Sequence, residues 1–334
     1  MPKLEKGFLH SVSVVIPVFQ VASELSALLD EIAQFFAPRI TARGHQYVIE
    51  EVILVHDGPE PEGAATLQEL AGRRERTRIV WLSRNFGQHP ATLAGMSASL
   101  ADWILTLDED GQFPPDALAS LLDNALEFKS PVVYGQPLTS TTHALWRRVG
   151  SWATRSLFSV LLGTRNWARF SSFRLIQGET GRAVGAYCTN ETYLDVALTW
   201  VSPRSSSVQV KYRETRSSSA YGFKRLFAHF MRMFLTMGTR PMRIFAALGG
   251  IAATSGFILS GALIYRRLVL GFPTGFASTL ALLLVLTGLL LLGLAILSEY
   301  VGIIVRSAIG RPLYVPISNP IHSALFQDTP HQRS

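Results

Sequence analysis

The chain has 334 residues, 48% of them hydrophobic, with a net charge of +7 and a mean hydropathy of +0.24, which is apolar for a protein that is soluble throughout. Its single cysteine, Cys188, excludes an intrachain disulfide and favours a reducing compartment. The sequence contains no helix-turn-helix, zinc-ligand spacing or aromatic RNA-binding motif, so nucleic acid is not an expected partner.

Charge is distributed unevenly along the chain. Residues 131–243 hold 16 Lys or Arg and 4 Asp or Glu, whereas residues 1–130 hold 10 and 18. The basic segment precedes the most apolar part of the sequence, so we expect it to face anionic headgroups or a phosphorylated lipid. The first apolar run lacks the features of a cleaved signal peptide, so we expect the globular part in the cytosol.

Short runs rich in β-branched residues predict the strands of a sheet. In chain order they cover residues 11–18, 50–55, 78–82, 103–107, 131–135 and 208–213. Helical patterns at residues 23–36 and 91–100 lie between the early strands. This alternation predicts an α/β fold, with a mostly parallel, Rossmann-like sheet and helices on both faces.

Three polar clusters each follow the carboxyl end of a predicted strand. Their members are Asp57 and Gly58, then Asn85, Gly87 and Gln88, and finally Asp108, Glu109 and Asp110. Such strand ends meet at one edge of a parallel sheet, where ligands bind, so we expect the clusters to line one crevice. Neither GxGxxG nor GxxxxGK[ST] follows a strand, which argues against a dinucleotide oxidoreductase and a P-loop NTPase.

The acidic cluster lies in the stretch WILTLDEDGQFPPD, residues 103–116. Asp108 and Asp110 point the same way on an extended backbone, and Gln112 adds an amide oxygen. These oxygens suit Mg²⁺ or Mn²⁺ that also carries substrate phosphates. The alternative is an acidic surface turn in which Asp116 caps the next helix.

The segments SVVIPVF, VILVHDGPE, LSRNFGQHPATLAGM and LTLDEDGQFPPD, in this order and spacing, resemble the GT-A fold of inverting family 2 glycosyltransferases. Within that family they are similar to the polyprenyl-phosphate branch, which includes dolichol-phosphate mannose synthases, bactoprenol glucosyltransferases and the undecaprenyl-phosphate aminoarabinose transferase. The resemblance implies a mixed sheet and a nucleotide-sugar site. The residues implied at that site are Pro17, Asp57, Gly58, Asn85, Gly87, Gln88 and Asp108.

The resemblance also implies the metal ligands, which are Asp108, Asp110 and Gln112. Two departures fall in the nucleotide pocket: the family usually has Asp-Asp-Gly-Ser where this chain has His56-Asp57-Gly58-Pro59, and Asn-Glu where it has Gln20-Val21.

The acceptor is expected in the basic segment. RFSSFRLI, residues 169–176, resembles the family's Ser-Asp-Phe-Arg-Leu motif, with Ser172 in place of the acid. In that family the Arg holds the acceptor phosphate, and a guanidinium matches phosphate oxygens bidentately. The expected acceptor-phosphate residues are Arg147, Ser172, Arg174, Arg213 and Arg216. The expected catalytic residues are Asp108, Asp110 and Arg174.

The C-terminal part predicts membrane attachment. Residues 221–238 have the spacing of a basic amphipathic helix at the membrane interface. The apolar runs 242–265 and 276–305 each exceed the ~20 residues that cross a bilayer and predict a transmembrane hairpin with both ends in the cytosol. SEYVG and RPLYV resemble the ending of bacterial polyprenyl-phosphate glycosyltransferases. The tail after Pro316 is expected to be disordered.

The predicted organisation is a cytosolic GT-A domain at residues 1–220, a juxtamembrane helix at 221–241, the hairpin at 242–306 and a cytosolic tail at 307–334. The resemblance implies metal-dependent, inverting transfer of a sugar from a nucleotide sugar to undecaprenyl phosphate, with UDP favoured over GDP. The product would serve cell-envelope glycan modification at the inner membrane of a bacterium. Homo-oligomers associated through the membrane segments are compatible with this assignment.

Two alternatives stay open at this point. The departures at His56 and Gln20 also fit a non-catalytic membrane protein that binds a sugar nucleotide or serves as a partner subunit. A polysaccharide synthase is the other enzyme class, although the sequence has no Gln-x-x-Arg-Trp and only two predicted spans.

Overall fold

The structure is a computed structural model of the chain. It describes residues 8–21, 23–58, 61–138, 170–188, 193–202, 204–213, 275–308 and 312–322, with isolated helical positions between 249 and 269. The chain forms two compact units. Unit 1 comprises residues 1–159, 164–220 and 312–334, and unit 2 comprises residues 160–163 and 221–311.

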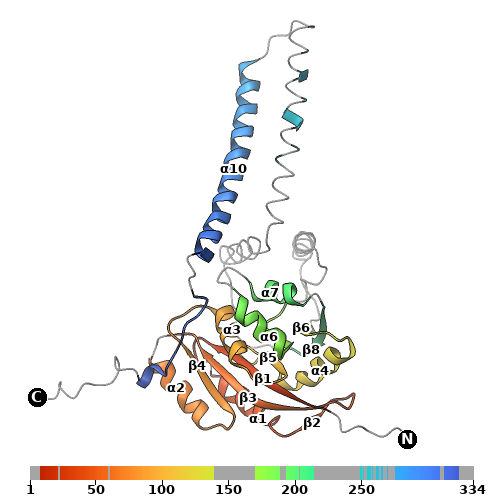
Figure 1. The fold of residues 1–334 in the computed structure, drawn as a ribbon, viewed down its shortest axis with the longest axis vertical. Helices are drawn as coiled ribbons and strands as arrows, with labels where there is room; N and C mark the ends of the chain where they lie inside the picture. The colour runs from red at the N-terminus through yellow and green to blue at the C-terminus, as the bar shows by residue number, and fades with distance from the viewer. Residues whose placement is uncertain are drawn as a thin grey trace, which may run out of the picture. The chain divides into compact units, whose positions relative to one another are not determined.

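Within the described residues, unit 1 is built around a mixed sheet of nine strands (Figure 1). The strands are β1 Leu9–Val18, β2 Arg39–Ile40, β3 Gln46–His56, β4 Thr77–Leu82, β5 Trp103–Thr106, β6 Val132–Pro137, β7 Arg174–Gln177, β8 Ser205–Val210 and β9 Pro316–Ile317. Their order is β8, β6, β7, β5, β1, β3, β4, β9, with β2 beside β3. Strand β7 is antiparallel to β5 and β6, and β9 is antiparallel to β4, whereas β1, β3, β4 and β5 are parallel.

Helices cover both faces of this sheet, as the sequence predicts. Helices α1 Leu25–Ala33, α2 Pro61–Gly72 and α4 Leu118–Glu127 contribute to the core on one face, and α3 Gln88–Ala98, α6 Gly178–Tyr187 and α7 Leu194–Val201 to the core on the other. Strand β1 is buried on both faces because Val14 packs in the first core and Val15 in the second. A strand covered on both sides carries apolar residues in succession, which explains the run VVIPV at residues 14–18.

The predicted strands are confirmed with shifted ends. Strand β3 begins at Gln46, four residues before the predicted start, and β8 spans Ser205–Val210 where residues 208–213 were expected. Strand β7 coincides with the end of the RFSSFRLI motif. Because β7 runs antiparallel, its first residue, Arg174, lies at the same edge as the carboxyl end of β5.

Residues 312–322 pack against the rest of unit 1. The Ser83 amide donates to the Val315 carbonyl at 2.9 Å, and β9 continues the sheet beside β4. Asn319 donates to Gln68 of α2 at 2.9 Å. The prediction of disorder after Pro316 is therefore wrong for residues 317–322, because this segment continues the sheet along the outer edge of β4.

In unit 2, helix α10 spans Phe276–Ala308, so the predicted apolar run 276–305 is helical. Counting only the part of the chain that the structure describes, no helix is found that is both long and apolar enough to cross a membrane. The transmembrane hairpin therefore stays a prediction. The predicted amphipathic helix at 221–238 and most of the run 242–265 lie outside the described residues.

Candidate active site

The carboxyl ends of the parallel strands align at one edge of the sheet. Val18 of β1 pairs with His56 of β3, and His56 also faces Trp81 near the end of β4. Leu107, just after β5, donates its amide to the Val15 carbonyl at 3.0 Å. The segments that follow these strands therefore meet at this edge.

Asp57 shapes the loop formed by residues 83–88. Its Oδ1 accepts the Phe86 amide and its Oδ2 accepts the Gly87 amide, both at 2.7 Å. Gly87 has φ +97°, a conformation that glycine adopts without strain, and it is the N-cap of α3. Burial raises the pKa of Asp57, although the two amide hydrogen bonds oppose this shift. Asp57 thus fixes the backbone that carries Asn85, Gly87 and Gln88.

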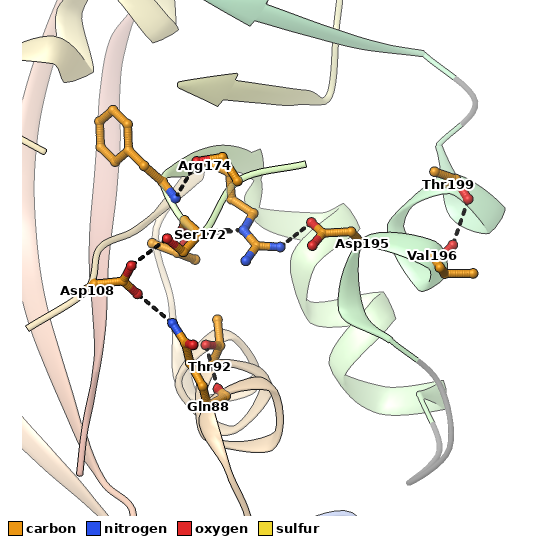
Figure 2. A network of polar contacts seen from close by, with 11 residues as sticks. Gln88, Thr92, Asp108, Ser172, Arg174, Asp195, Val196 and Thr199 are labelled. Carbon is orange, nitrogen blue, oxygen red and sulfur yellow. Dashed lines mark hydrogen bonds and ion pairs between the residues drawn. The ribbon is translucent and has the colours of Figure 1, made fainter. Parts of the chain in front are cut away.

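Asp108 connects this loop with the predicted acceptor motif (Figure 2). Its Oδ1 accepts Nε2 of Gln88 at 2.5 Å, and its Oδ2 accepts Oγ of Ser172 at 2.5 Å. Burial raises the pKa of Asp108 and the charge of Asp110 adds to that rise, while Ser172, Arg174 and Gln88 oppose it. A half-buried carboxylate beside a second carboxylate favours a nearby cation.

The turn after Asp108 is compact. Gly111 has φ +63°, and the Gln112 amide donates to Oδ1 of Asp110 at 3.2 Å. Tyr212, just beyond β8, donates its hydroxyl to Oε1 of Gln112, and the Arg213 amide donates to the Gln112 carbonyl at 2.9 Å. The turn is therefore held against the end of β8.

The residues of this turn fit a divalent cation. Asp108 and Asp110 interact electrostatically, and Gln112 provides an amide oxygen, so the donors are the hard oxygens that Mg²⁺ and Mn²⁺ prefer. Among the described residues, no group of three or more His, Cys, Asp or Glu could hold a metal. A cation here would thus have two carboxylates and an amide from the protein, with other ligands from substrate and water. The alternative role for Asp116 finds no support, because no side-chain hydrogen bond caps η1 Pro115–Ala117 or α4.

Arg174 lies behind Ser172 in a buried network. Its guanidinium forms an ion pair with Asp195 of α7, and its Nε donates to Oγ1 of Thr106 at 3.2 Å. Burial opposes the guanidinium charge and lowers the pKa of Arg174, but the Asp195 carboxylate, Tyr134, Tyr193 and Asp108 together outweigh burial and raise that pKa. Tyr134 shares the carboxylate, and its own pKa is raised by burial and by Asp195. Arg174 is only 3% exposed.

The other predicted residues have varied surroundings. Pro17 pairs with Val55 in the sheet, Gly58 is buried, and Asn85 is exposed. Arg213 makes a two-point ion pair with Glu31 of α1, at 2.9 and 3.0 Å. Arg147 and Arg216 lie outside the described residues. The assigned roles of all these residues stay predictions.

His56 and Asp195 receive no role from sequence reasoning. His56 is buried, with its ring edge-on to Trp81 at 5.3 Å between centroids, so it belongs to the interior and not to an exposed turn. Asp195 is an acid within the otherwise apolar run LDVALTWV, on the buried face of α7. An acid on the buried face of an amphipathic helix signals a buried partner, and that partner is Arg174.

Comparison with known proteins identifies the family of this chain. The family model described as Glycosyl transferase family 2 matches residues 13–194. Two relatives are the undecaprenyl-phosphate 4-deoxy-4-formamido-L-arabinose transferases of Pectobacterium carotovorum and Edwardsiella ictaluri. The first is 28% identical over 92% of this chain, and the second is 29% identical over 91% of it. Each alignment covers 92% of the relative. The crystal structure of S. aureus TarS 1-349 with UDP-GlcNAc is 17% identical, covers 68% of this chain and 66% of that one, and has a TM-score of 0.45, too low to carry functional detail.

The family match includes most of β1, the Asp57 and Asp108 loops and the Ser172 motif, and it ends at Leu194, the first residue of α7. It extends over more than half of the chain. The chain therefore belongs to glycosyl transferase family 2 and is a glycosyltransferase.

Proposed function

We propose that this glycosyltransferase transfers a sugar from a nucleotide sugar to undecaprenyl phosphate and releases a nucleoside diphosphate. The names of the relatives, which align over almost the whole chain, support the lipid acceptor. The observation that carries the proposal is a pair of hydrogen bonds to the Asp108 carboxylate. One comes from Gln88 of the 83–88 loop and the other from Ser172 of the predicted acceptor motif. The two substrate-binding elements therefore meet at one side chain.

In the proposed reaction, an oxygen of the lipid phosphate attacks the anomeric carbon of the donor. A new carbon–oxygen bond forms, the bond from that carbon to the diphosphate breaks, and the electron pair leaves with the nucleoside diphosphate. This single displacement inverts the anomeric centre. A phosphate acceptor is largely ionised at neutral pH, so the site needs no strong general base. It does need to stabilise the charge of the leaving diphosphate.

The donor site is assigned to the aligned strand ends. Pro17 and Gly58 would lie beside the nucleoside, while Asp57 holds the loop that carries Asn85 and Gly87. Asp108, Asp110 and Gln112 would hold Mg²⁺ or Mn²⁺, which supplies positive charge at the leaving diphosphate when bound. We favour UDP over GDP as the leaving group.

The acceptor phosphate is assigned to Ser172 and the neighbouring arginines. Arg174 is buried against Asp195, so its contribution is the positive charge that also acts on Asp108. Arg213 is about half exposed and pairs with Glu31, so phosphate binding by Arg213 requires exchange of that partner. We place the enzyme at the inner membrane of a bacterium, anchored by the predicted hairpin, with unit 1 in the cytosol.

The proposal is tested with the purified full chain in detergent, undecaprenyl phosphate and a panel of labelled UDP- and GDP-sugars. We expect label from one donor to enter the lipid phase with equimolar release of nucleoside diphosphate. EDTA should stop transfer, and Mn²⁺ or Mg²⁺ should restore it. Donor binding without release or transfer, across the panel, would instead support the non-catalytic alternative.

Asp110→Asn provides the matching site variant, and Asp116→Asn its control. Both residues lie in the same acidic stretch, but Asp116 is exposed on η1. We expect Asp110→Asn to eliminate transfer and Asp116→Asn to leave it within about twofold, since surface substitutions rarely have larger effects. Equal activity of the two variants would reject the metal assignment.

A further inference from the structure

A chain of buried polar side chains lies behind Asp108 (Figure 2). The paired side chains of Arg174 and Asp195 are 4% and 3% exposed, and Tyr134 bonds to the same carboxylate. Arg174 on β7 is the direct register partner of Thr106 on β5 and of Tyr134 on β6. Laterally paired residues project from the same face of a sheet, so all three side chains are directed toward the face that α7 covers.

This network reaches Asp108 through the backbone of Ser172. Arg174 Nε donates to Oγ1 of Thr106 at 3.2 Å and, more weakly, to the Ser172 carbonyl at 3.5 Å. Thr106 Oγ1 donates to that same carbonyl at 2.5 Å. Ser172 Oγ then donates to Oδ2 of Asp108 at 2.5 Å. The backbone of Ser172 is therefore fixed from behind while its hydroxyl is directed at the carboxylate.

We propose that Asp195, Tyr134 and Thr106 are positioning residues for Asp108. They hold Arg174 and the Ser172 backbone, so that the Asp108 carboxylate keeps one orientation toward a divalent cation. The inference rests on the proposed function for the presence of that cation. The positioning itself rests on the contacts described above.

A role in packing alone does not explain the network. Burying an ion pair is costly, and apolar residues of similar volume stabilise a fold equally well or better. Hydrogen-bonded groups behind a metal ligand have a different effect, because they fix its orientation. Their loss typically weakens metal binding 10- to 100-fold.

Thr106→Val gives the sharpest test, because it removes the linking hydroxyl at nearly constant shape and charge. Binding of Mn²⁺ alone to the full chain in detergent is measured from the electron paramagnetic resonance signal of free Mn²⁺. We expect Thr106→Val to bind Mn²⁺ about tenfold more weakly than the wild type. A melting curve of each variant reports the loss of stability separately.

Thr41→Val is the matched control. Thr41 is 5% exposed against 2% for Thr106, and its hydroxyl also donates at 2.5 Å, to Asp123. Thr41 lies near the amino-terminal end of β3, at the opposite edge from Asp108. We expect a similar loss of stability for Thr41→Val, with Mn²⁺ affinity within twofold of the wild type.

Asp195→Asn tests the ion pair at constant shape, and we expect it to weaken Mn²⁺ binding at least as much as Thr106→Val. Wild-type Mn²⁺ affinity in both variants overturns the proposal, and Thr106→Val alone decides if Asp195→Asn does not fold. A wild-type chain that binds no Mn²⁺ overturns the metal assignment and this inference together. A third outcome separates the two proposals: the wild type binds Mn²⁺, both variants bind it more weakly, and the wild type transfers no sugar. This outcome overturns the proposed function and leaves the positioning role supported.

Discussion

Ser172 Oγ donates to Asp108 Oδ2 at 2.5 Å, although 64 positions separate the two residues in the chain. Burial and Asp110 already raise the pKa of Asp108, so a neighbour that donates a hydrogen bond stabilises its ionised carboxylate. A hydroxyl supplies that proton, whereas the acid found at this position in the family would add a third negative charge. The replacement of the acid by Ser172 therefore suits this particular cluster.

We predict that Ser172→Ala weakens Mn²⁺ binding and lowers sugar transfer, each about tenfold, because Asp108 loses the donor that orients it. Ser172→Thr keeps the hydroxyl and should retain most of both. Metal titrations and initial rates at saturating Mn²⁺ separate the two effects. Unchanged Mn²⁺ affinity in Ser172→Ala, combined with lost transfer, would mean that the hydroxyl acts on the acceptor and not on Asp108.

Glu51 makes stability depend on pH in the acid range. Although burial opposes the shift, hydrogen bonds from Ser13 at 2.7 Å, Leu100 at 2.9 Å and Arg78 at 2.9 Å lower the pKa of Glu51 below its ordinary 4.5. The ionised form therefore stabilises the fold above that ordinary value, and the contribution is lost as the pH falls through the lowered pKa. Glu51→Gln should reduce the free energy of unfolding at pH 7 by about 2 kcal/mol.

The measurement is urea unfolding of both proteins between pH 7 and pH 3. The wild type should lose its advantage over Glu51→Gln as the pH falls, so the two curves converge. Glu50→Gln is the control, since Glu50 is the exposed neighbour on the same strand. A constant difference between wild type and Glu51→Gln across this range would contradict the assigned cause.

Much of the fold follows from local sequence patterns. The β-branched runs of β1, β3, β4 and β5 are followed by turn residues, and this periodicity is enough to predict strands and a common polar edge. Strand β9 is not predictable in this way, because its two residues are defined by pairing with β4 and not by a pattern of their own. Its partner lies more than 200 positions away.

The site was predictable to the same extent. Asp57, Gln88 and Asp108 occupy the edge that their positions after strands indicate. The partners of these residues are set by tertiary contacts that no local pattern contains. Sequence spacing shows neither that Asp195 neutralises Arg174 nor that Arg213 pairs with Glu31. Arg174 is expected from the sequence to hold the acceptor phosphate, and its burial against Asp195 is not part of that expectation.

Gly95 permits the close approach of α3 to the sheet. A Cβ at this position would lie 2.3 Å from Cγ1 of Val15 and 2.9 Å from Cγ2 of Val55. Gly95→Ala should therefore displace α3 and cost about 1 to 3 kcal/mol of stability, as overpacking does. Because α3 begins at Gln88, we also expect weaker Mn²⁺ binding at Asp108.

Gly72→Ala is the control for this prediction, because nothing lies within 4 Å of a Cβ at the end of α2. It should leave the melting temperature unchanged or slightly higher, since alanine favours the helix by up to about 1 kcal/mol. Equal melting temperatures for the two variants would show that α3 has room at Gly95.

The segment 312–322 should be required for a stable donor site. It covers the edge of β4, binds the Ser83 amide at the start of the 83–88 loop, and places the Tyr314 hydroxyl 3.0 Å from Oγ of Ser97 on α3. Truncation after residue 311 exposes this edge, so we expect a lower melting temperature, faster proteolysis near β4 and weaker nucleotide binding. Truncation after residue 322 keeps every one of these contacts and should behave as the full chain. If the shorter chain melts and binds nucleotide like the longer one, β4 and the loop are stable without β9, and the segment has no structural role at the site.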